Sequence, residues 1–466
     1  MDLSAAVSDQ DSSFPKSGNY LTEFTNGGVY VYNDTTEKQV SSGDQWQFWC
    51  SGGQVQDCGT VDTENGPYDT QIAYDWVQGR WITAALSPYG PTPTPDDPNG
   101  RGYELYVAAS SDASPTDSFY RFSVQACPDF PGTFGDNDIM GVSPYTSSGA
   151  VGRVVIDVLC YSTATGSYVG DEIWDFATGK LEANKLAYRR FESSQLKYSP
   201  IRVRPATHVH GGGEIPLSSV SVNSSGYPQL NVYKLIPAPI GGTISQDTIN
   251  FVGQYTGSVA VSTNGAPLAP QPGTSQEIQT QDLDPDNGDA FINVYNSDNY
   301  FATSFTASLP DGTDSVYYIF ALNLQTGSFR LMPVEFVGDQ VSYSSVAVDN
   351  DNELALNYTV FSPDTPAVSY ADLYDYIPLT SIPVLDGPWQ LVASSAPLTS
   401  TCNASNACRW GDYTAEVFDY SCTAANAGLT NECYMFWQVT EYTPDGTSEG
   451  SNITSLYDLQ FSNDTE

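Results

Sequence analysis

The sequence predicts an all-β protein folded as a single β-propeller. Between Gln71 and Ser395 the chain repeats one unit five times, each with four short runs rich in Val, Ile, Tyr, Phe and Trp, at a period of about 50 to 65 residues. Gly, Pro, Asn, Asp and Ser separate the runs, as turns separate antiparallel strands. A four-stranded sheet cannot bury both its faces alone, so the units must pack on one another in a ring of six or seven blades.

The first unit shows its four strands in order: Ile72–Trp76, Arg80–Leu86, Tyr103–Ser110 and Phe119–Gln125. The same pattern places the five central blades at residues 71–125, 138–190, 201–257, 289–337 and 342–395. A ring of sheets adds core with every blade, so 466 residues fit one domain.

The two ends of the chain are predicted to complete the ring. Residues 1–18 are polar and are expected to form a flexible N-terminal arm, with the propeller spanning 19–466. Asn19–Phe24 and Gly28–Asn33 are strand-like and flank an Asn-Gly-Gly turn. The last strands fall within residues 410–420, 433–442 and 455–461. These terminal strands either share one blade or form two incomplete ones.

Two segments interrupt the strand pattern. Residues 91–98 alternate proline with polar residues, and residues 262–281 are rich in Gly, Pro, Ser and Gln. Because proline lacks the backbone donor that a sheet needs, both segments are predicted to be surface loops and not ladder strands.

Charge excludes one class of partner. The chain has 55 acidic and 16 basic residues, for a formal net charge of −39. Such a surface repels phosphate backbones and anionic membranes, so nucleic acid is not expected as a partner. The imbalance comes mainly from scarce Lys and Arg, and it suits salty, acidic or cation-rich surroundings. No run reaches the ~20 apolar residues that a membrane span needs.

The eight cysteines predict disulfides and an extracellular or cell-surface location. They fall in four local pairs: Cys50 with Cys58, Cys127 with Cys160, Cys402 with Cys408, and Cys422 with Cys433. An even count, with no Cys-x-x-Cys and only two histidines, is typical of an oxidising compartment and not of zinc ligation. The N-terminal residues lack the basic and apolar segments of a signal peptide.

Six sequons permit N-glycosylation. They are Asn33, Asn223, Asn357, Asn403, Asn452 and Asn463.

Calcium is the one candidate cofactor. Asp282, Asp284, Asp286 and Asp289 place carboxylates close together in one acidic segment, as hard-cation loops do. The twelfth position of this segment is Asn293, where an EF-hand has Glu. The alternative is an acidic turn without a metal.

The two histidines, His208 and His210, lie on one face of a predicted strand. Together with a carboxylate they could bind a metal, but no third ligand is identifiable, and packing near the central channel is the alternative. Tyr89 and Tyr145 fall at predicted loop tips, where aromatic rings can serve as stacking platforms.

No catalytic residues are identified. Ten arginines spread along the chain and the absence of Ser-x-Asp-x-Gly-x-Thr-Trp turns argue against a sialidase. Serine-hydrolase elbows and nucleotide-binding loops are absent from the sequence. A two-carboxylate glycosidase stays open, because spacing in sequence does not give separation across a ring.

Three groups of motifs resemble a group of secreted, largely uncharacterised propeller proteins. Arg409-Trp-Gly-Asp-Tyr-Thr414 followed by Phe436-Trp-Gln-Val-Thr-Glu-Tyr442 is similar to their "RWGDY…fW…EY" ending. The segments from Asp69 to Trp81 and from Tyr343 to Asn357 resemble their blade motifs. The resemblance implies a sialidase-like propeller fold and names no chemistry. Asp412 and Glu441 belong to these motifs, with either a structural or a catalytic role.

A whole-chain scaffold without a catalytic set predicts a secreted binding or assembly module, such as an extracellular filament or matrix subunit. Its expected partner is itself, or an extracellular glycan or protein. The alternative is a glycoside hydrolase or lyase that uses an acidic pair in the central channel.

Overall fold

The computed structural model describes residues 3–7, 20–25, 28–33, 38–50, 67–75, 77–87, 103–116, 118–144, 152–208, 214–239, 242–262, 268–280, 290–295, 298–312, 314–348, 354–375, 384–399, 402, 406–410, 415–418, 435–446 and 450–457. Within these ranges the chain is nearly all β. Helical turns are confined to α1 (Gln45–Cys50), α2 (Thr178–Leu181), η1 (Ser193–Gln195) and η2 (Ile244–Gln246). None of these helices is long and apolar enough to cross a membrane.

Six antiparallel sheets of four strands, A to E and G, occur in the described chain, and two of them are joined by a further pairing described below. Sheet A contains β1 (Leu3–Val7), β2 (Tyr20–Thr25), β3 (Gly28–Asn33) and β4 (Lys38–Asp44). Sheet B contains β5 (Tyr68–Asp75), β6 (Arg80–Leu86), β7 (Glu104–Ser110) and β8 (Phe119–Gln125). Sheet C contains β9 (Thr133–Ser143), β10 (Arg153–Ser162), β11 (Tyr168–Ala177) and β12 (Tyr188–Glu192). Sheet D contains β13 (Arg204–His208), β14 (Ile215–Val222), β15 (Pro228–Ile236) and β16 (Thr248–Thr256). Sheet E contains β19 (Ala290–Tyr295), β20 (Asp298–Ser308), β21 (Ser315–Asn323) and β22 (Phe329–Phe336).

Three further sheets complete the described chain. Sheet G contains β23 (Gln340–Val348), β24 (Leu354–Phe361), β25 (Val368–Asp375) and β26 (Val384–Ala393). Sheet H contains β28 (Ala415–Phe418), β29 (Met435–Tyr442) and β30 (Gly450–Tyr457). A small sheet F contains β17 (Leu268–Pro270), β18 (Glu277–Gln279) and β27 (Ala407–Arg409).

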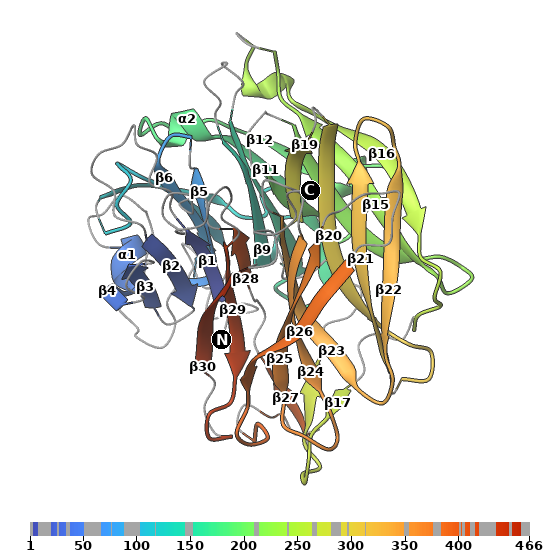
Figure 1. Ribbon diagram of the computed structural model, residues 1–466. Coiled ribbons are helices and arrows are strands. Elements are labelled where there is room, and N and C mark those ends of the chain that lie inside the picture. The colour runs from blue at the N-terminus through green and yellow to red at the C-terminus, as the bar shows by residue number, and fades with distance from the viewer. Residues whose placement is uncertain are drawn as a thin grey trace, which may run out of the picture.

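The first strands of the sheets form a closed circuit, which makes the chain a β-propeller (Figure 1). In this circuit β1 contacts β5, and the contacts continue through β9, β13, β19, β23 and β28 back to β1. Between β13 and β19 the contact is a parallel ladder, from Ala206 opposite Ala290 to His208 opposite Ile292, which joins sheets D and E. The predicted fold class is confirmed. Among the described residues seven sheets take part, while six or seven blades for the whole chain stays a prediction.

The terminal strands do not share a sheet in the described chain. The N-terminal strands build sheet A and the C-terminal strands build sheet H, and the two sheets meet where β1 contacts β28 and β29. Of the two closures that the sequence left open, a shared blade is not seen among the described strands, and two incomplete blades are matched only in part, because sheet A has four strands and sheet H has three.

Three inner strands carry the same β-bulge. Asp69 in β5, Asn137 in β9 and Tyr343 in β23 have φ of 53°, 54° and 55°, and at each of them the register to the next strand shifts. A bulge adds a residue to one strand and bends it. The Asp69 Oδ2 atom accepts the Asn137 backbone N–H at 2.8 Å, which links sheet B to sheet C. Asp69 and Tyr343 open two motifs of the resemblance, so these residues shape the inner strands.

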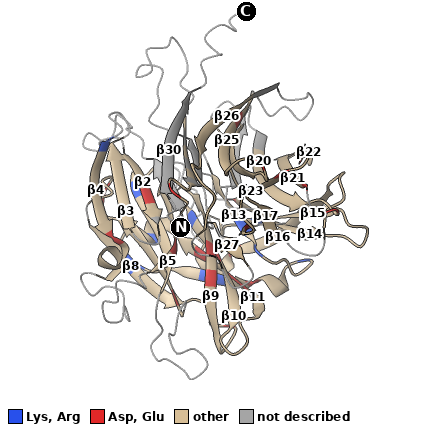
Figure 2. Cartoon of the chain, turned by 90° about the horizontal axis from the view of Figure 1, so that it is seen from below, with Lys and Arg blue, Asp and Glu red and all other residues tan. Residues whose placement is uncertain are grey.

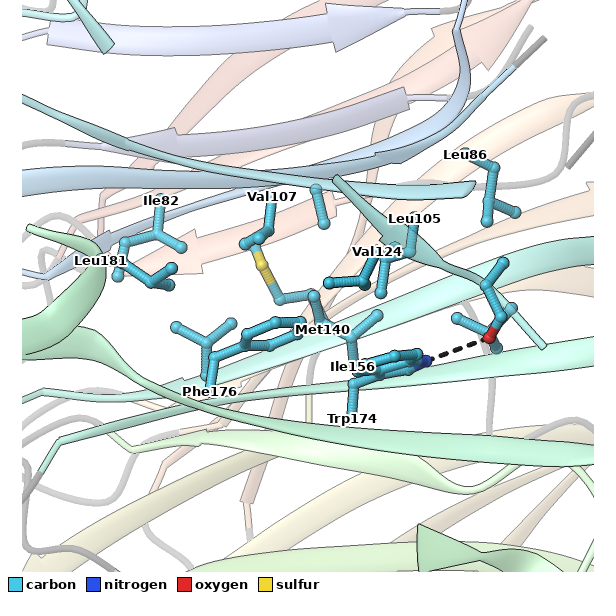
Figure 3. Packing of buried hydrophobic residues seen from close by; sticks show 14 of the residues in the cluster. Ile82, Leu86, Leu105, Val107, Val124, Met140, Ile156, Trp174, Phe176 and Leu181 are labelled. Carbon is cyan, nitrogen blue, oxygen red and sulfur yellow. Dashed lines mark hydrogen bonds between the residues drawn. The ribbon is translucent and has the colours of Figure 1, made fainter. Parts of the chain in front are cut away.

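The core lies between neighbouring sheets. Trp174 and Phe176 of β11 pack against Ile82 of β6 and Met140 of β9 between sheets B and C (Figure 3). The Trp174 indole N–H donates to the Ala126 carbonyl at 3.1 Å. Large apolar side chains therefore join the two facing sheets, and the one N–H among them, that of the Trp174 indole, has a hydrogen-bond acceptor.

Gly141 sets the distance between two inner strands. A Cβ on Gly141 of β9 would lie 2.6 Å from the Ala206 carbonyl oxygen of β13. Since the obstacle is backbone, we expect Gly141→Ala to lower the free energy of unfolding by about 1 to 3 kcal/mol. The control is Gly43→Ala in β4, where a Cβ meets nothing within 4 Å. Urea unfolding measures both variants, and equal stabilities would contradict a tight β9–β13 contact.

The prediction for residues 262–281 was wrong in part, because this run contains the ladder strands β17 and β18. Pro270 is tolerated since β17 is the edge strand of sheet F, where a missing N–H breaks no ladder. β18 pairs with β27, from Glu277 opposite Ala407 to Gln279 opposite Arg409. Ile278 is buried with Trp410 and Phe361. The hairpin is thus docked on its own chain. Residues 91–98 lie outside the described residues.

The predicted N-terminal arm also needs correction. Leu3–Val7 are not loose: they form β1, pair with β2 and contact β5 in the ring. The rest of residues 1–18 falls outside the described ranges. Leu3, Ala5, Ala6 and Val7 of this strand are apolar, so the polar composition of residues 1–18 taken as a whole hid a short strand.

Two of the four predicted disulfides are present in the described chain. Cys127 and Cys160 are bonded with 5.9 Å between their Cα atoms, and Cys402 is bonded to Cys408. Cys50 is also disulfide-bonded. Cys58, Cys422 and Cys433 lie outside the described residues. These disulfides fit an extracellular protein.

Candidate functional site

Bands of acidic and basic residues mark sheet C in a protein whose described strands are mostly uncharged (Figure 2). One face of this sheet carries buried charged residues. Alternation along β10 puts Arg153, Val155 and Asp157 on this face, and alternation along β11 adds Asp171, Ile173 and Asp175. Val155 and Ile173 pack against Leu217 and Tyr233 of sheet D. We call these six residues of sheet C the C–D seam. All six are at most 1% exposed.

Asp157 and Asp171 hold the chain where it enters sheet D. The Asp171 Oδ2 atom accepts the backbone N–H of Arg202 at 2.8 Å, and the Asp157 Oδ2 atom accepts the next N–H, from Val203, also at 2.8 Å. Burial raises the pKa of Asp171 to about 7. Burial, and then the charge of Asp171, raise the pKa of Asp157 well above its usual range. The two carboxyls therefore serve as acceptors for a chain connection.

The other end of the C–D seam is an ion-paired cluster. The Arg153 Nε atom lies 2.6 Å from Asp247 Oδ2 and 3.3 Å from Asp175 Oδ1. Asp247, between η2 and β16, also accepts the Ala238 N–H at 2.7 Å. Burial, and then a hydrogen bond with Asp247, raise the pKa of Asp175 well above its usual value. Arg153 thus balances two carboxyls from different sheets.

The opposite face of sheet C has its own carboxyl, Glu172. Its Oε1 atom accepts the Asp129 backbone N–H at 2.9 Å and lies 3.6 Å from Arg190 Nη1. Arg190 Nη1 is also 2.9 Å from Asp129 Oδ2. Burial raises the pKa of Glu172 to about 7. These contacts of Glu172 and Arg190 with Asp129 hold the loop between β8 and β9 against sheet C.

A carboxyl pair also spans sheets B and C. Asp75, at the end of β5, accepts the N–H groups of Val77 and Gln78 at 3.0 Å each. Burial, and then the charge of Asp75, raise the pKa of Glu182, just after α2, to about 8. The closeness of the two carboxyls therefore disfavours two negative charges at this position.

Four of these carboxyls have the raised pKa of catalytic acids but are out of reach of a substrate. Asp157, Asp171, Glu172 and Asp175 are all 0% exposed. A general acid must come within hydrogen-bond reach of its substrate. In the described chain these four groups instead touch backbone N–H groups, arginines and other carboxyls, so their arrangement supports a structural role.

Sequence reasoning missed the C–D seam, although two signals were present. Asp157 interrupts the apolar run of β10, and Asp171 and Asp175 interrupt that of β11. In addition, eight of the 16 Lys and Arg residues lie between 180 and 234, against three Glu and no Asp. The structure uses some of these cations around sheet C: the Arg189 Nη1 atom donates to the Ser245 carbonyl at 2.7 Å and to the Asp247 carbonyl.

Of the residues predicted for metal binding, only His208 lies among the described residues. Asp282, Asp284, Asp286 and Asp289 lie outside the described residues, as does His210. His208 is in β13 and is 4% exposed, within the ladder to β19. No group of three metal-ligating side chains occurs in the part of the chain that the structure describes.

Some of the other predicted positions lie among the described residues and some lie outside them. Asn357 is 0% exposed and accepts a hydrogen bond from the Ser345 hydroxyl at 2.7 Å, so its amide is out of reach of glycosylation in the folded chain. Asn223 lies in the β14–β15 turn and accepts the N–H groups of Ser225 and Tyr227. Asn33 and Asn452 lie in β3 and β30. Outside the described residues lie Asn403, Asn463, Tyr89, Tyr145 and Asp412. Glu441 is placed in β29.

Comparison with known proteins gives likeness of fold only. No protein-family model matches the chain, and neither does any curated protein. AofleA from Arthrobotrys oligospora is similar at a TM-score of 0.37 and 11% identity, covering 83% of this chain and 87% of that one. A Trypanosoma rangeli sialidase is similar at 0.35 and 11%, covering 79% of this chain and 53% of the sialidase. The WD40 domain of SCAP from fission yeast is similar at 0.35 and 8%, covering 98% and 88%. Likeness at this level assigns no activity.

Proposed function

We propose that this protein is an extracellular β-propeller that works as a non-catalytic binding or assembly module. The observation that carries the proposal is the full burial of four carboxyls whose pKa is raised. Asp157, Asp171, Glu172 and Asp175 are 0% exposed and are engaged in holding the sheets together. A glycoside hydrolase or lyase needs such groups in contact with substrate.

The partner that we propose is a second copy of this chain, or an extracellular glycan or protein. With a net charge of −39, copies of the chain repel one another at low ionic strength. Salt or a divalent cation screens this repulsion and is expected to favour assembly. The β17–β18 hairpin and β1 are used within the chain, so neither is offered as a connector between copies.

Two measurements on the full chain test the proposal. Incubation with a panel of polysaccharides is expected to release no reducing ends above the buffer control. Sedimentation across salt and calcium concentrations is expected to show oligomers that grow as repulsion is screened. Release of reducing ends would instead favour the hydrolase. A monomer under all conditions, together with no binding to the panel or to extracellular proteins, would overturn the binding proposal.

A further inference from the structure

The connection between sheets C and D depends on two buried carboxyls. Residues 196–203 lead from the outer side of sheet C to β13, the innermost strand of sheet D. Arg202 has φ of 55°, an uncommon conformation for a residue with a side chain. Its N–H and that of Val203 both point at carboxyl oxygens, at 2.8 Å each. Val203 is itself 0% exposed and belongs to the apolar core of the C–D seam.

The surroundings of the pair disfavour two negative charges. Asp157 and Asp171 are 0% exposed, and Asp157 Oδ1 has no hydrogen-bond partner among the described residues. An ionised carboxyl without such partners is costly to bury. The ionisable groups around the pair are Tyr161 on β10, Tyr168 and Glu172 on β11, Asp136 on β9, and Arg202. Arg202 is the one cation in this group, against up to four carboxylates.

We propose that the C–D seam is a pH-dependent joint. It is closed while Asp157 and Asp171 hold protons, and it loosens around residues 196–203 when both carboxyls ionise. A neutral carboxyl still accepts a backbone N–H through its carbonyl oxygen, so protonation keeps both hydrogen bonds and removes the repulsion. Ionisation strengthens each hydrogen bond but places two like charges in a site that is buried from solvent.

The direction of the effect follows from linkage. Burial raises the pKa of Asp171 in the folded protein from 3.8 to about 7, so the folded state holds the proton more tightly than the unfolded state. The stabilising contribution of that proton is complete below the unfolded pKa and is lost as pH rises through the folded pKa. The seam is therefore tightest in acid and loosens between about pH 4 and pH 7.

Hydrogen exchange of the Arg202 and Val203 amides tests the proposal. Protection at each pH is the intrinsic exchange rate of the amide divided by its measured exchange rate. All exchange rates are measured at about 0.5 M salt, which screens the net charge of the protein. The wild-type protection is expected to fall at least about tenfold between pH 5 and pH 8. The Asn side chain of the Asp171→Asn variant is neutral at every pH and keeps an oxygen acceptor. Protection in this variant is expected to fall less between pH 5 and pH 8 than in the wild type. At pH 8 this variant is expected to be better protected than the wild type, whereas a carboxyl with only a structural role predicts lower protection at every pH.

Asp364→Asn is the matched control, because Asp364 is an exposed residue in the turn between β24 and β25. It is expected to keep the wild-type profile. If Asp171→Asn does not fold, Asp157→Asn repeats the test at the second carboxyl. The pH dependence of protection in the wild type can be measured without any variant. Protection in the wild type that does not change between pH 5 and pH 8, or a fall as steep in both Asn variants, would overturn the proposal.

Discussion

Replacing Arg153 by Met is expected to lower the free energy of unfolding by about 3 to 5 kcal/mol. Arg153 is 1% exposed, and its Nε atom lies within 3.3 Å of carboxyl oxygens of both Asp175 and Asp247. Removing the guanidinium leaves two adjacent buried carboxyls with no cation between them. Breaking one partner of a buried ion pair costs more than the pair itself contributes, because the remaining charge is uncompensated.

The cause can be separated from a simple packing loss by adding a second substitution. Arg153→Met with Asp175→Asn removes one of the stranded carboxyls and is expected to recover part of the lost stability. Lys185→Met, at an exposed position, is the control and is expected to change stability by about 0.5 kcal/mol or less. Urea unfolding at neutral pH measures all three variants. A single Arg153→Met variant as stable as the wild type would show that the guanidinium does not balance this seam.

Replacing Trp174 by Ala is expected to cost about 3 to 5 kcal/mol. The indole is 1% exposed, stacks on Phe176 with 5.8 Å between ring centroids, and donates to the Ala126 carbonyl at 3.1 Å. The substitution leaves a cavity between sheets B and C and an acceptor without its donor. Both effects act on the same contact between neighbouring sheets.

Tyr188→Ala is the comparison for this variant. Tyr188 touches the same indole, with 5.2 Å between ring centroids, but is 42% exposed, so its removal opens little buried volume. We expect it to cost about 1 kcal/mol or less. Thermal unfolding followed by circular dichroism ranks the two variants. A larger loss for Tyr188→Ala than for Trp174→Ala would contradict the central place of the indole in this core.

The sheets of the ring could be predicted from local features of the sequence. Arg80–Leu86 and Phe119–Gln125 are predicted and observed with the same bounds. The central blade limits agree with the observed sheets to within a few residues. These features are local: turn residues end a strand wherever they stand, and apolar residues of high β-propensity continue it. The pairing of Cys127 with Cys160 was also predicted, from their closeness in sequence; Cys127 lies just after β8 and Cys160 lies in β10.

The charged residues that hold neighbouring sheets together could not be predicted from the sequence. Asp157, Asp171 and Asp247 are ordinary acidic residues in the sequence, and their burial depends on the sheet that packs over them. The hairpin of β17 and β18 likewise depends on β27, which follows it by more than 120 residues. A pKa responds to the loss of water and to charges within a few ångströms, and both are set by contacts between segments that the chain order keeps far apart. The repeated strand pattern therefore predicted the propeller scaffold. The C–D seam could not be predicted in this way, because it depends on how sheet D packs on sheet C.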